Sequence, residues 1–290
     1  MIDEVARAHG LDVRIDGVDE TGWDFRVHFA TDGDGSRWVL REPRRPEVAE
    51  RIPVEARLLA VLRPRLPVEL PEWEITAPDL VAYRRLAGEP LASDDPIAVA
   101  MPLITASEGH LVRLGAVIAA LHSTPSAEVA PTGIEIAGPE ALRTDVADRL
   151  AAGVAELAVP ERCVDRWRRW LDDDRCWRGE GVPVHHDLSP NHTLVNGSGI
   201  LTGLLDWADA GVDDPVSDFV APLAAFGPRA LDRLLAAYRA AGGDPERPRR
   251  EHVAALTTFR RTVSLGLHGL RTGQRRFVDL ARGRLTCAGR

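Results

Sequence analysis

A short segment in the second half of the chain carries polar side chains whose types and spacing suggest catalysis. Asp187 precedes His192 by five residues, and Asp206 follows a predicted hairpin whose turn is Asn196-Gly197-Ser198-Gly199. The hairpin would bring His192 and Asp206 to one end of a small sheet, near Asp187. Phosphoryl transfer needs a base for the acceptor hydroxyl, metal ligands and a cation on the nucleotide phosphates. We therefore expect Asp187 to act as the base and His192 and Asp206 to bind a metal ion.

The metal ligand on this segment has two candidates. Magnesium prefers oxygen ligands, which makes the imidazole of His192 an unusual donor for it. The neighbouring residue, Asn191, offers an amide oxygen. The distance of five residues from Asp187 favours His192, and Asn191 is the alternative.

The elements that must position these groups begin with strands in the first third of the chain. Alternating apolar and polar residues, with a glycine-rich turn after the first run, predict strands over residues 23–29, 37–41 and 79–83. Pro53 stands at a position typical of a helix start, and residues 54–63 continue with a helical pattern. Glu55 lies on the apolar face of that predicted helix.

Helical patterns dominate the rest of the chain. They cover residues 111–121, 140–156 and 162–171, and most of the chain after Asp206. The polar, turn-rich residues 88–96 are typical of a connection between two units. We therefore predict an α+β protein that divides into residues 1–86 and residues 87–290.

The composition excludes several classes of site. None of the 290 residues is lysine, which excludes both a Gly-Lys-Ser/Thr phosphate loop and a Schiff-base mechanism. The net charge of −8 disfavours nucleic acid as a partner. The sequence has neither a membrane-spanning apolar run nor a secretory signal, so we expect a cytoplasmic protein that does not enter a membrane.

Several separate blocks of this sequence resemble the aminoglycoside and macrolide phosphotransferases, and within that family the macrolide 2'-phosphotransferases most closely. The likeness extends over nearly the whole chain. The blocks are Trp38-Val39-Leu40-Arg41-Glu42-Pro43-Arg44-Arg45-Pro46, Glu55-Ala56-Arg57-Leu58-Leu59, Leu80-Val81-Ala82-Tyr83, Trp167-Arg168-Arg169-Trp170-Leu171-Asp172-Asp173-Asp174, His185-x-Asp187 with His192, Leu205-Asp206-Trp207 and Val212-Asp213-Asp214-Pro215-x-x-Asp218.

The resemblance implies a two-lobed protein-kinase-like fold. A small N-terminal lobe, residues 1–86, would contain an antiparallel sheet and one key helix, would bind the nucleotide and would end in the hinge. A larger, mostly helical C-terminal lobe, residues 87–290, would carry the catalytic and substrate-binding residues.

The same resemblance assigns roles to residues of the N-terminal lobe. Arg41 would bind the nucleotide phosphates, and Glu55 would pair with it. Val81-Ala82-Tyr83 would form the hinge against which the base stacks. Gly22 is the single glycine of the turn that would cover the phosphates. GTP with Mg²⁺ is the expected donor, and ATP is the alternative.

A macrolide is the acceptor that the resemblance implies, phosphorylated at the 2'-hydroxyl of its desosamine sugar by an enzyme expected to be a monomer. Desosamine carries a dimethylammonium group at neutral pH, so an acidic wall is expected around it. Asp209, Asp213 and Asp214 follow Asp206 closely and could form that wall.

Residues around the catalytic segment have a structural role or depart from the family pattern. Asp218 and Asp214 are candidates to brace the loop that carries Asp187, and His122 is expected to pack beneath it. His186 stands where the family has glycine, and a side chain at that position could strain the loop.

Other functions stay open at this stage. The same scaffold could phosphorylate an aminoglycoside, an amino sugar or an alcohol such as choline. A metal-dependent phosphohydrolase could use His186-Asp187, but it would carry this doublet inside a helix, whereas Pro190 and the hairpin follow here. A catalytically silent binding protein is suggested mainly by His186.

Overall fold

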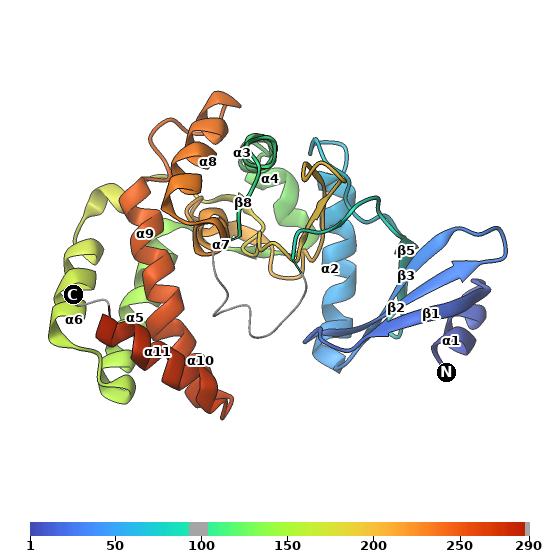
Figure 1. Ribbon diagram of the computed structural model, residues 1–290, viewed down its shortest axis with the longest axis horizontal. Helices are drawn as coiled ribbons and strands as arrows, with labels where there is room; N and C mark the ends of the chain where they lie inside the picture. The colour runs from blue at the N-terminus through green and yellow to red at the C-terminus, as the bar shows by residue number, and fades with distance from the viewer. Residues whose placement is uncertain (93–103, 288–290) are drawn as a thin grey trace.

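A five-stranded antiparallel sheet forms one end of the molecule (Figure 1). The computed structural model describes residues 1–92 and 104–287. In the order β1-β2-β3-β5-β4, the sheet contains β1 (Val13–Asp19), β2 (Phe25–Asp32), β3 (Arg37–Pro43), β5 (Val81–Arg84) and β4 (Trp73–Thr76). A short helix, α1 (Ile2–Ala8), packs on one face through the buried Ala6. The three predicted strands are confirmed, while α1, β1 and β4 were not predicted from the sequence.

The helix beside the sheet, α2 (Pro46–Leu62), is longer than the sequence predicted. It begins at Pro46, and Pro53 lies inside it, so the predicted start at Pro53 is wrong. A proline inside a helix removes one hydrogen bond. Here Val48 and Ile52, which precede it, are buried against the sheet, and this apolar contact holds the first turns in helical form. The C-terminal half of α2 buries Leu58, Leu59 and Leu62, from the same stripe of the helix, in the core of the other lobe.

Helices make up most of the second lobe (Figure 1). They are α3 (Glu108–His122), α4 (Ser126–Val129), α5 (Pro139–Leu157), α6 (Glu161–Leu171), α7 (Ser217–Phe226), α8 (Pro228–Ala240), α9 (Arg250–Phe259), α10 (Leu265–Arg271) and α11 (Arg275–Cys287), with 3-10 turns η2 (Ala130–Thr132) and η3 (Asp174–Cys176). A π-helical turn, η4 (Arg260–Ser264), joins α9 to α10. No helix in the described parts of the chain is long and apolar enough to cross a membrane.

The chain also forms two small three-stranded sheets, whose strands are interspersed among the helices along the sequence. One has the order β10-β9-β6, formed by β6 (Glu89–Pro90), β9 (Thr193–Val195) and β10 (Leu201–Leu204); the other has the order β7-β11-β8, formed by β7 (Glu135–Ile136), β8 (Val182–Val184) and β11 (Gly211–Asp213). The antiparallel pair β9–β10 closes over Asn196, whose N–H bonds to the carbonyl of Ile200. The predicted hairpin is therefore confirmed, and the architecture is the predicted two-lobed α+β arrangement.

Candidate active site

The segment that carries Asp187 is held by one buried carboxylate. Asp218, in the first turn of α7, accepts hydrogen bonds from the backbone N–H groups of His185 (2.9 Å) and His186 (2.8 Å). Its second oxygen lies 3.0 Å from Nε2 of His122, which is buried at the end of α3. Burial alone would raise the pKa of Asp218, but the contact with His122 outweighs it, so the pKa is lowered. The predicted bracing by Asp218 and the predicted place of His122 beneath the loop are both confirmed.

Two residues of the site adopt left-handed backbone conformations that are uncommon outside glycine. His186 has φ of 69°, and Asp206 has φ of 60°. His186 therefore occupies a backbone conformation that glycine adopts without steric cost, as the family pattern suggested. Its Nε2 lies 3.6 Å from Oδ2 of Asp213. The segment from His185 to Asp187 is not helical, contrary to what the phosphohydrolase alternative requires.

The structure brings the three predicted catalytic and metal-binding side chains together. Nδ1 of His192 lies 3.3 Å from Oδ2 of Asp187, and its Nε2 lies 3.4 Å from Oδ2 of Asp206. Burial lowers the pKa of His192, but the hydrogen bond and charge of Asp187, together with Asp206, raise it to about 9. Burial likewise raises the pKa of Asp187, and the contact with His192 outweighs it, so Asp187 stays ionised far below neutral pH.

Arg41 extends this cluster into the sheet lobe. Its Nη1 donates to Oε1 of Glu55 at 3.2 Å, and its Nη2 lies 3.5 Å from Oδ1 of Asp206. The guanidinium group also stacks over the ring of Phe25, with 4.0 Å between Cζ and the ring centroid. Arg41 and Glu55 are both buried, in agreement with the expected pair, and Asp206 joins them to His192 and Asp187.

A divalent cation could be held between Asp206 and His192 if it displaces the proton of the imidazole, whose pKa is raised to about 9. The two facing donor atoms are 3.4 Å apart, and a magnesium ion at about 2.1 Å from each could contact both. No group of three His, Cys, Asp or Glu side chains in the described part of the chain forms a ready-made metal site. Protein sites for magnesium commonly offer only one or two side chains, and phosphate oxygens and water complete the shell. In the same part of the chain no side-chain hydrogen bond or ion pair involves Asn191, so the contacts favour His192.

The turn between β1 and β2 contacts the helical lobe through one side chain, Trp23. Gly22 lies in this turn, where a Cβ atom would stand only 2.7 Å from the carbonyl oxygen of Phe25. Arg45 donates to the carbonyl of Trp23 at 2.9 Å and anchors the turn to the start of α2. The indole ring of Trp23 lies edge-on to His268 of α10, with 6.1 Å between ring centroids. Sequence reasoning missed Trp23, which no motif marks.

The residues predicted to form the hinge lie inside the five-stranded sheet. Val81-Ala82-Tyr83 lies inside β5, which is hydrogen-bonded to β3 on one side and to β4 on the other. Their backbone groups are therefore used in the sheet, and all three side chains are buried. Backbone that could face a nucleotide base begins after Arg84, where β5 ends. The strand over these residues was predicted correctly, but its pairing on both sides could not be predicted because β4 was not recognised in the sequence.

The three predicted acidic residues differ in exposure. Asp209 is exposed, beside the cluster around Asp206. Asp213 is buried, accepts a hydrogen bond from Ser217 and has its pKa raised to about 6 by burial. Asp214 is 1% exposed and accepts a hydrogen bond from the backbone N–H of Val216. Only Asp209 is thus open to a solvent-borne cation, and Asp214 braces the loop after β11.

The comparisons with known proteins agree with this geometry. Residues 18–253 match the model of the phosphotransferase enzyme family. The YcbJ protein of Bacillus subtilis (strain 168), itself uncharacterized, is 37% identical over 283 residues, which cover 96% of this chain and 92% of that protein.

Solved structures of macrolide 2'-phosphotransferases are similar over nearly the whole chain. The type I enzyme is 36% identical, with a TM-score of 0.85, and the match covers 98% of this chain and 95% of that one. The apoenzyme of MphH from Brachybacterium faecium is 37% identical, with a TM-score of 0.85, and the match covers 98% and 96%.

Proposed function

Because this chain belongs to the phosphotransferase enzyme family, we propose that it phosphorylates the 2'-hydroxyl of the desosamine sugar of macrolide antibiotics and so confers resistance to them. GTP is the proposed donor, with ATP as the alternative. The bond between the γ-phosphorus and the β–γ bridging oxygen breaks, the nucleoside diphosphate leaves, the γ-phosphoryl group forms a phosphate monoester on the sugar, and the hydroxyl proton passes to a base.

One observation carries this proposal. Asp187, His192, Asp206 and Arg41 form a continuous chain of contacts of 3.3 to 3.5 Å between the two lobes. They do so in a chain that is 36% and 37% identical to two macrolide 2'-phosphotransferases along nearly its full length. A base, a metal-binding pair and a phosphate-binding cation in one cluster are the groups that phosphoryl transfer requires.

Each group has a role that follows from its chemistry. The ionised carboxylate of Asp187 accepts a hydrogen bond from the attacking hydroxyl, orients it and takes its proton. Asp206 and His192 would hold Mg²⁺, which neutralises charge on the phosphate oxygens when bound. Arg41, oriented by Glu55, would donate to the same phosphates, a role that falls to arginine because the chain has no lysine.

The two lobes divide the substrates in this proposal. Residues 1–86 would bind the nucleotide beneath the turn that contains Gly22, and residues 87–290 would bind the macrolide. Asp209, the exposed member of the acidic group, would attract the dimethylammonium of desosamine. We further propose that the enzyme acts as a monomer in the cytoplasm.

The test is phosphorylation by purified protein, followed by mass spectrometry. With Mg²⁺ and GTP, a 14-membered macrolide should gain one phosphoryl group. Asp187→Asn should lower the rate by about 10²–10⁴-fold, because the base is lost. Asp148→Asn, an exposed site on α5, is the matched control and should keep wild-type turnover.

A substrate panel separates this function from its rivals. It should include 14-, 15- and 16-membered macrolides, aminoglycosides and choline, each with GTP and with ATP. Phosphorylation of an aminoglycoside or of choline in place of every macrolide would reject the proposed acceptor. Unchanged turnover in Asp187→Asn would reject the proposed base.

A further inference from the structure

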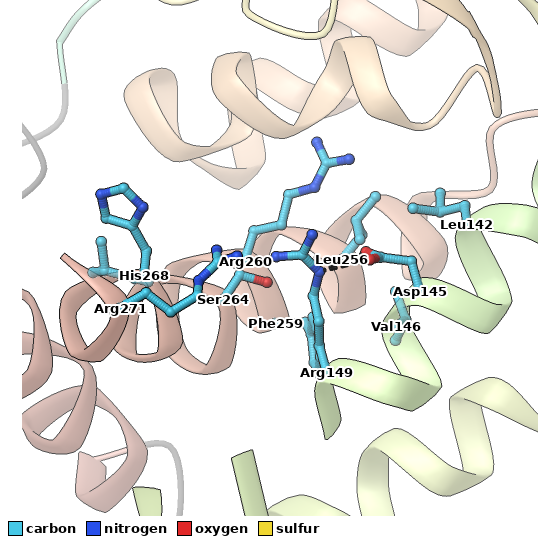
Figure 2. Close-up of a pocket in the computed structure, with 11 residues that line it drawn as sticks. Leu142, Asp145, Val146, Arg149, Leu256, Phe259, Arg260, Ser264, His268 and Arg271 are labelled. Atoms are coloured by element: carbon cyan, nitrogen blue, oxygen red, sulfur yellow. Dashed lines mark hydrogen bonds and ion pairs between the residues drawn. The ribbon is translucent and has the colours of Figure 1, made fainter. Parts of the chain in front are cut away.

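A cavity of about 380 Å³ lies in the helical lobe, between α5, α9, η4 and α10 (Figure 2). One part of its wall is apolar and comes from Leu142, Val146, Leu256, Phe259 and Leu265. These side chains belong to the buried core or stand at its edge, so this wall is fixed by the packing of three helices, α5, α9 and α10.

The polar part of the wall is cationic. Arg149, Arg260 and Arg271 come from three different helical segments, and His268 adds an imidazole. Figure 2 draws Asp145 as the one acidic residue of the lining, and both of its carboxylate oxygens accept from Nε of Arg149, at 2.8 and 2.7 Å. The cavity therefore carries a net positive charge in a protein whose net charge is −8.

Two of these arginines lack an anionic partner. Across residues 1–92 and 104–287, neither Arg260 nor Arg271 has a carboxylate oxygen within 4.0 Å. Arg260 donates only to the hydroxyl of Ser217, at 3.4 Å. Burial lowers the pKa of Arg260 and outweighs the attraction of the nearest carboxylate, Asp213, which forms no ion pair with it. Arg260 is half-buried, so an incoming anion would stabilise its charge, and the exposed Arg271 would add a second cation at the edge of the cavity.

We propose that this cavity is an anion-binding subsite, which holds a phosphate or carboxylate group attached to an apolar body. The unpaired guanidinium groups of Arg260 and Arg271 bind the anion, because planar guanidinium matches both oxyanions in two-pronged geometry. The apolar wall accepts the rest of the ligand. Inorganic phosphate alone would contact the cationic part of the wall and leave the apolar part without a ligand.

The subsite is connected to the catalytic loop through a short chain of polar contacts. Arg260 donates to Ser217, Ser217 donates to Oδ2 of Asp213 at 3.2 Å, and the same oxygen lies 3.6 Å from Nε2 of His186. His186 directly precedes Asp187. An anion that draws Arg260 away from Ser217 therefore acts on the residue next to the base.

The product of the proposed reaction has the chemistry of this ligand, since a phosphorylated macrolide is an apolar ring that carries a phosphate monoester. That identification of the occupant rests on the proposed function, whereas the subsite itself does not. A cellular fatty acid or alkyl phosphate is the other source of the same chemistry.

Binding measurements test the subsite without turnover. Isothermal titration with octanoate, octyl phosphate, octanol and inorganic phosphate should give binding of the first two only. Arg271→Gln, at an exposed position, should weaken both by about tenfold, because a charge-assisted contact is lost. Arg260→Gln should do the same, and Arg282→Gln, exposed on α11, is the matched control that should bind as the wild type does.

The outcomes separate the proposal from its alternatives. Equal binding of octanol and octanoate, or wild-type binding by Arg271→Gln, would overturn the anion subsite, as would complete displacement of octanoate by Mg²⁺ and GDP. Binding of purified phosphorylated macrolide that depends on Arg271 would identify the product as the occupant, and its absence with octanoate binding intact would identify a cellular amphiphile. Asp187→Asn should still bind octanoate. Binding at the subsite can therefore be tested even if the proposed function fails.

Discussion

Arg41 reaches the site from a strand inside the five-stranded sheet, whereas Asp187 reaches it from a loop between two strands of three residues each, β8 and β9. β3 is paired with β2 on one side and β5 on the other, so that Arg41 stands opposite Val27 and Val81. The position of Arg41 thus follows from the register of three strands, to which many backbone hydrogen bonds contribute.

The loop that carries Asp187 is not held by hydrogen bonds between paired strands. The N–H groups of His185 and His186 donate to Asp218, which lies 33 and 32 residues further along the chain. Two residues of the site, His186 and Asp206, hold left-handed conformations that cost free energy. The loop is therefore maintained by a few side-chain bonds against backbone strain, and single substitutions should damage it more than they damage the sheet side.

The largest effect is expected for Asp218→Ala. The change leaves two buried N–H groups without an acceptor and removes the partner of His122, so the free energy of unfolding should fall by about 3–5 kcal/mol. Turnover should fall by about 10²-fold or more, because Asp187, the proposed base, loses its position. Urea denaturation and steady-state kinetics measure the two losses. Turnover within threefold of the wild type would show that Asp218 does not hold the loop.

A pH-dependent effect is expected for Asp213, behind the same loop. Burial raises the pKa of its carboxyl to about 6, above the ordinary value of 3.8, so the folded state binds this proton more tightly than the unfolded state does. Stability that is present below about pH 4 is then lost as the pH rises through about 6, by up to about 3 kcal/mol. Asp213→Asn cannot ionise and still accepts from Ser217.

The variant should therefore gain stability relative to the wild type between pH 4 and pH 7, by up to about 3 kcal/mol. Chemical denaturation of both proteins at the two pH values measures this difference directly. A difference that is the same at both pH values would contradict the raised pKa of Asp213.

The same contrast explains what could be predicted from the sequence. Local spacing was enough for Asp187, His192 and Asp206, because a hairpin of known length fixes their relative positions. Period-two alternation was enough for β2 and β3. The weaker strands β1 and β4 were missed, and without β4 the two-sided pairing of residues 81–83 could not be foreseen.

Contacts between distant segments were the least predictable. The cation of Arg260 comes from a π-helical turn, and its bond to Ser217 joins residues 43 positions apart. The contact of Trp23 with His268 crosses between lobes. Neither contact produces a periodic pattern, since both depend on how completed helices and strands pack. The sequence left two roles open for Asp214, in an acidic wall or as a brace. Its burial, which depends on tertiary structure, favours the brace.

A smaller effect is expected on the sheet side from Glu55→Gln. The variant keeps the size of the side chain but removes its charge, and Arg41 retains Asp206 as a partner at 3.5 Å. Because strand register still places Arg41, stability should fall by about 2 kcal/mol, less than for Asp218→Ala. The KM for the nucleotide should rise by about tenfold, with a smaller change in kcat.

Glu50→Gln, exposed on the same helix, is the matched control and should leave both constants unchanged. A loss of stability in Glu55→Gln as large as that of Asp218→Ala would remove the proposed difference between the two sides of the site.

The smallest effect isolates the backbone strain at His186, where a pair of variants separates side chain from conformation. His186→Ala and His186→Gly both remove the imidazole and its contact with Asp213, but only glycine relieves the cost of φ at 69°. At an ordinary backbone position alanine would be the more stable of the two. Here glycine should be more stable than alanine by about 1 kcal/mol, as measured by urea denaturation at pH 7. Alanine more stable than glycine would mean that the loop relaxes out of the left-handed conformation once the histidine is gone, and that Asp218 alone does not impose it.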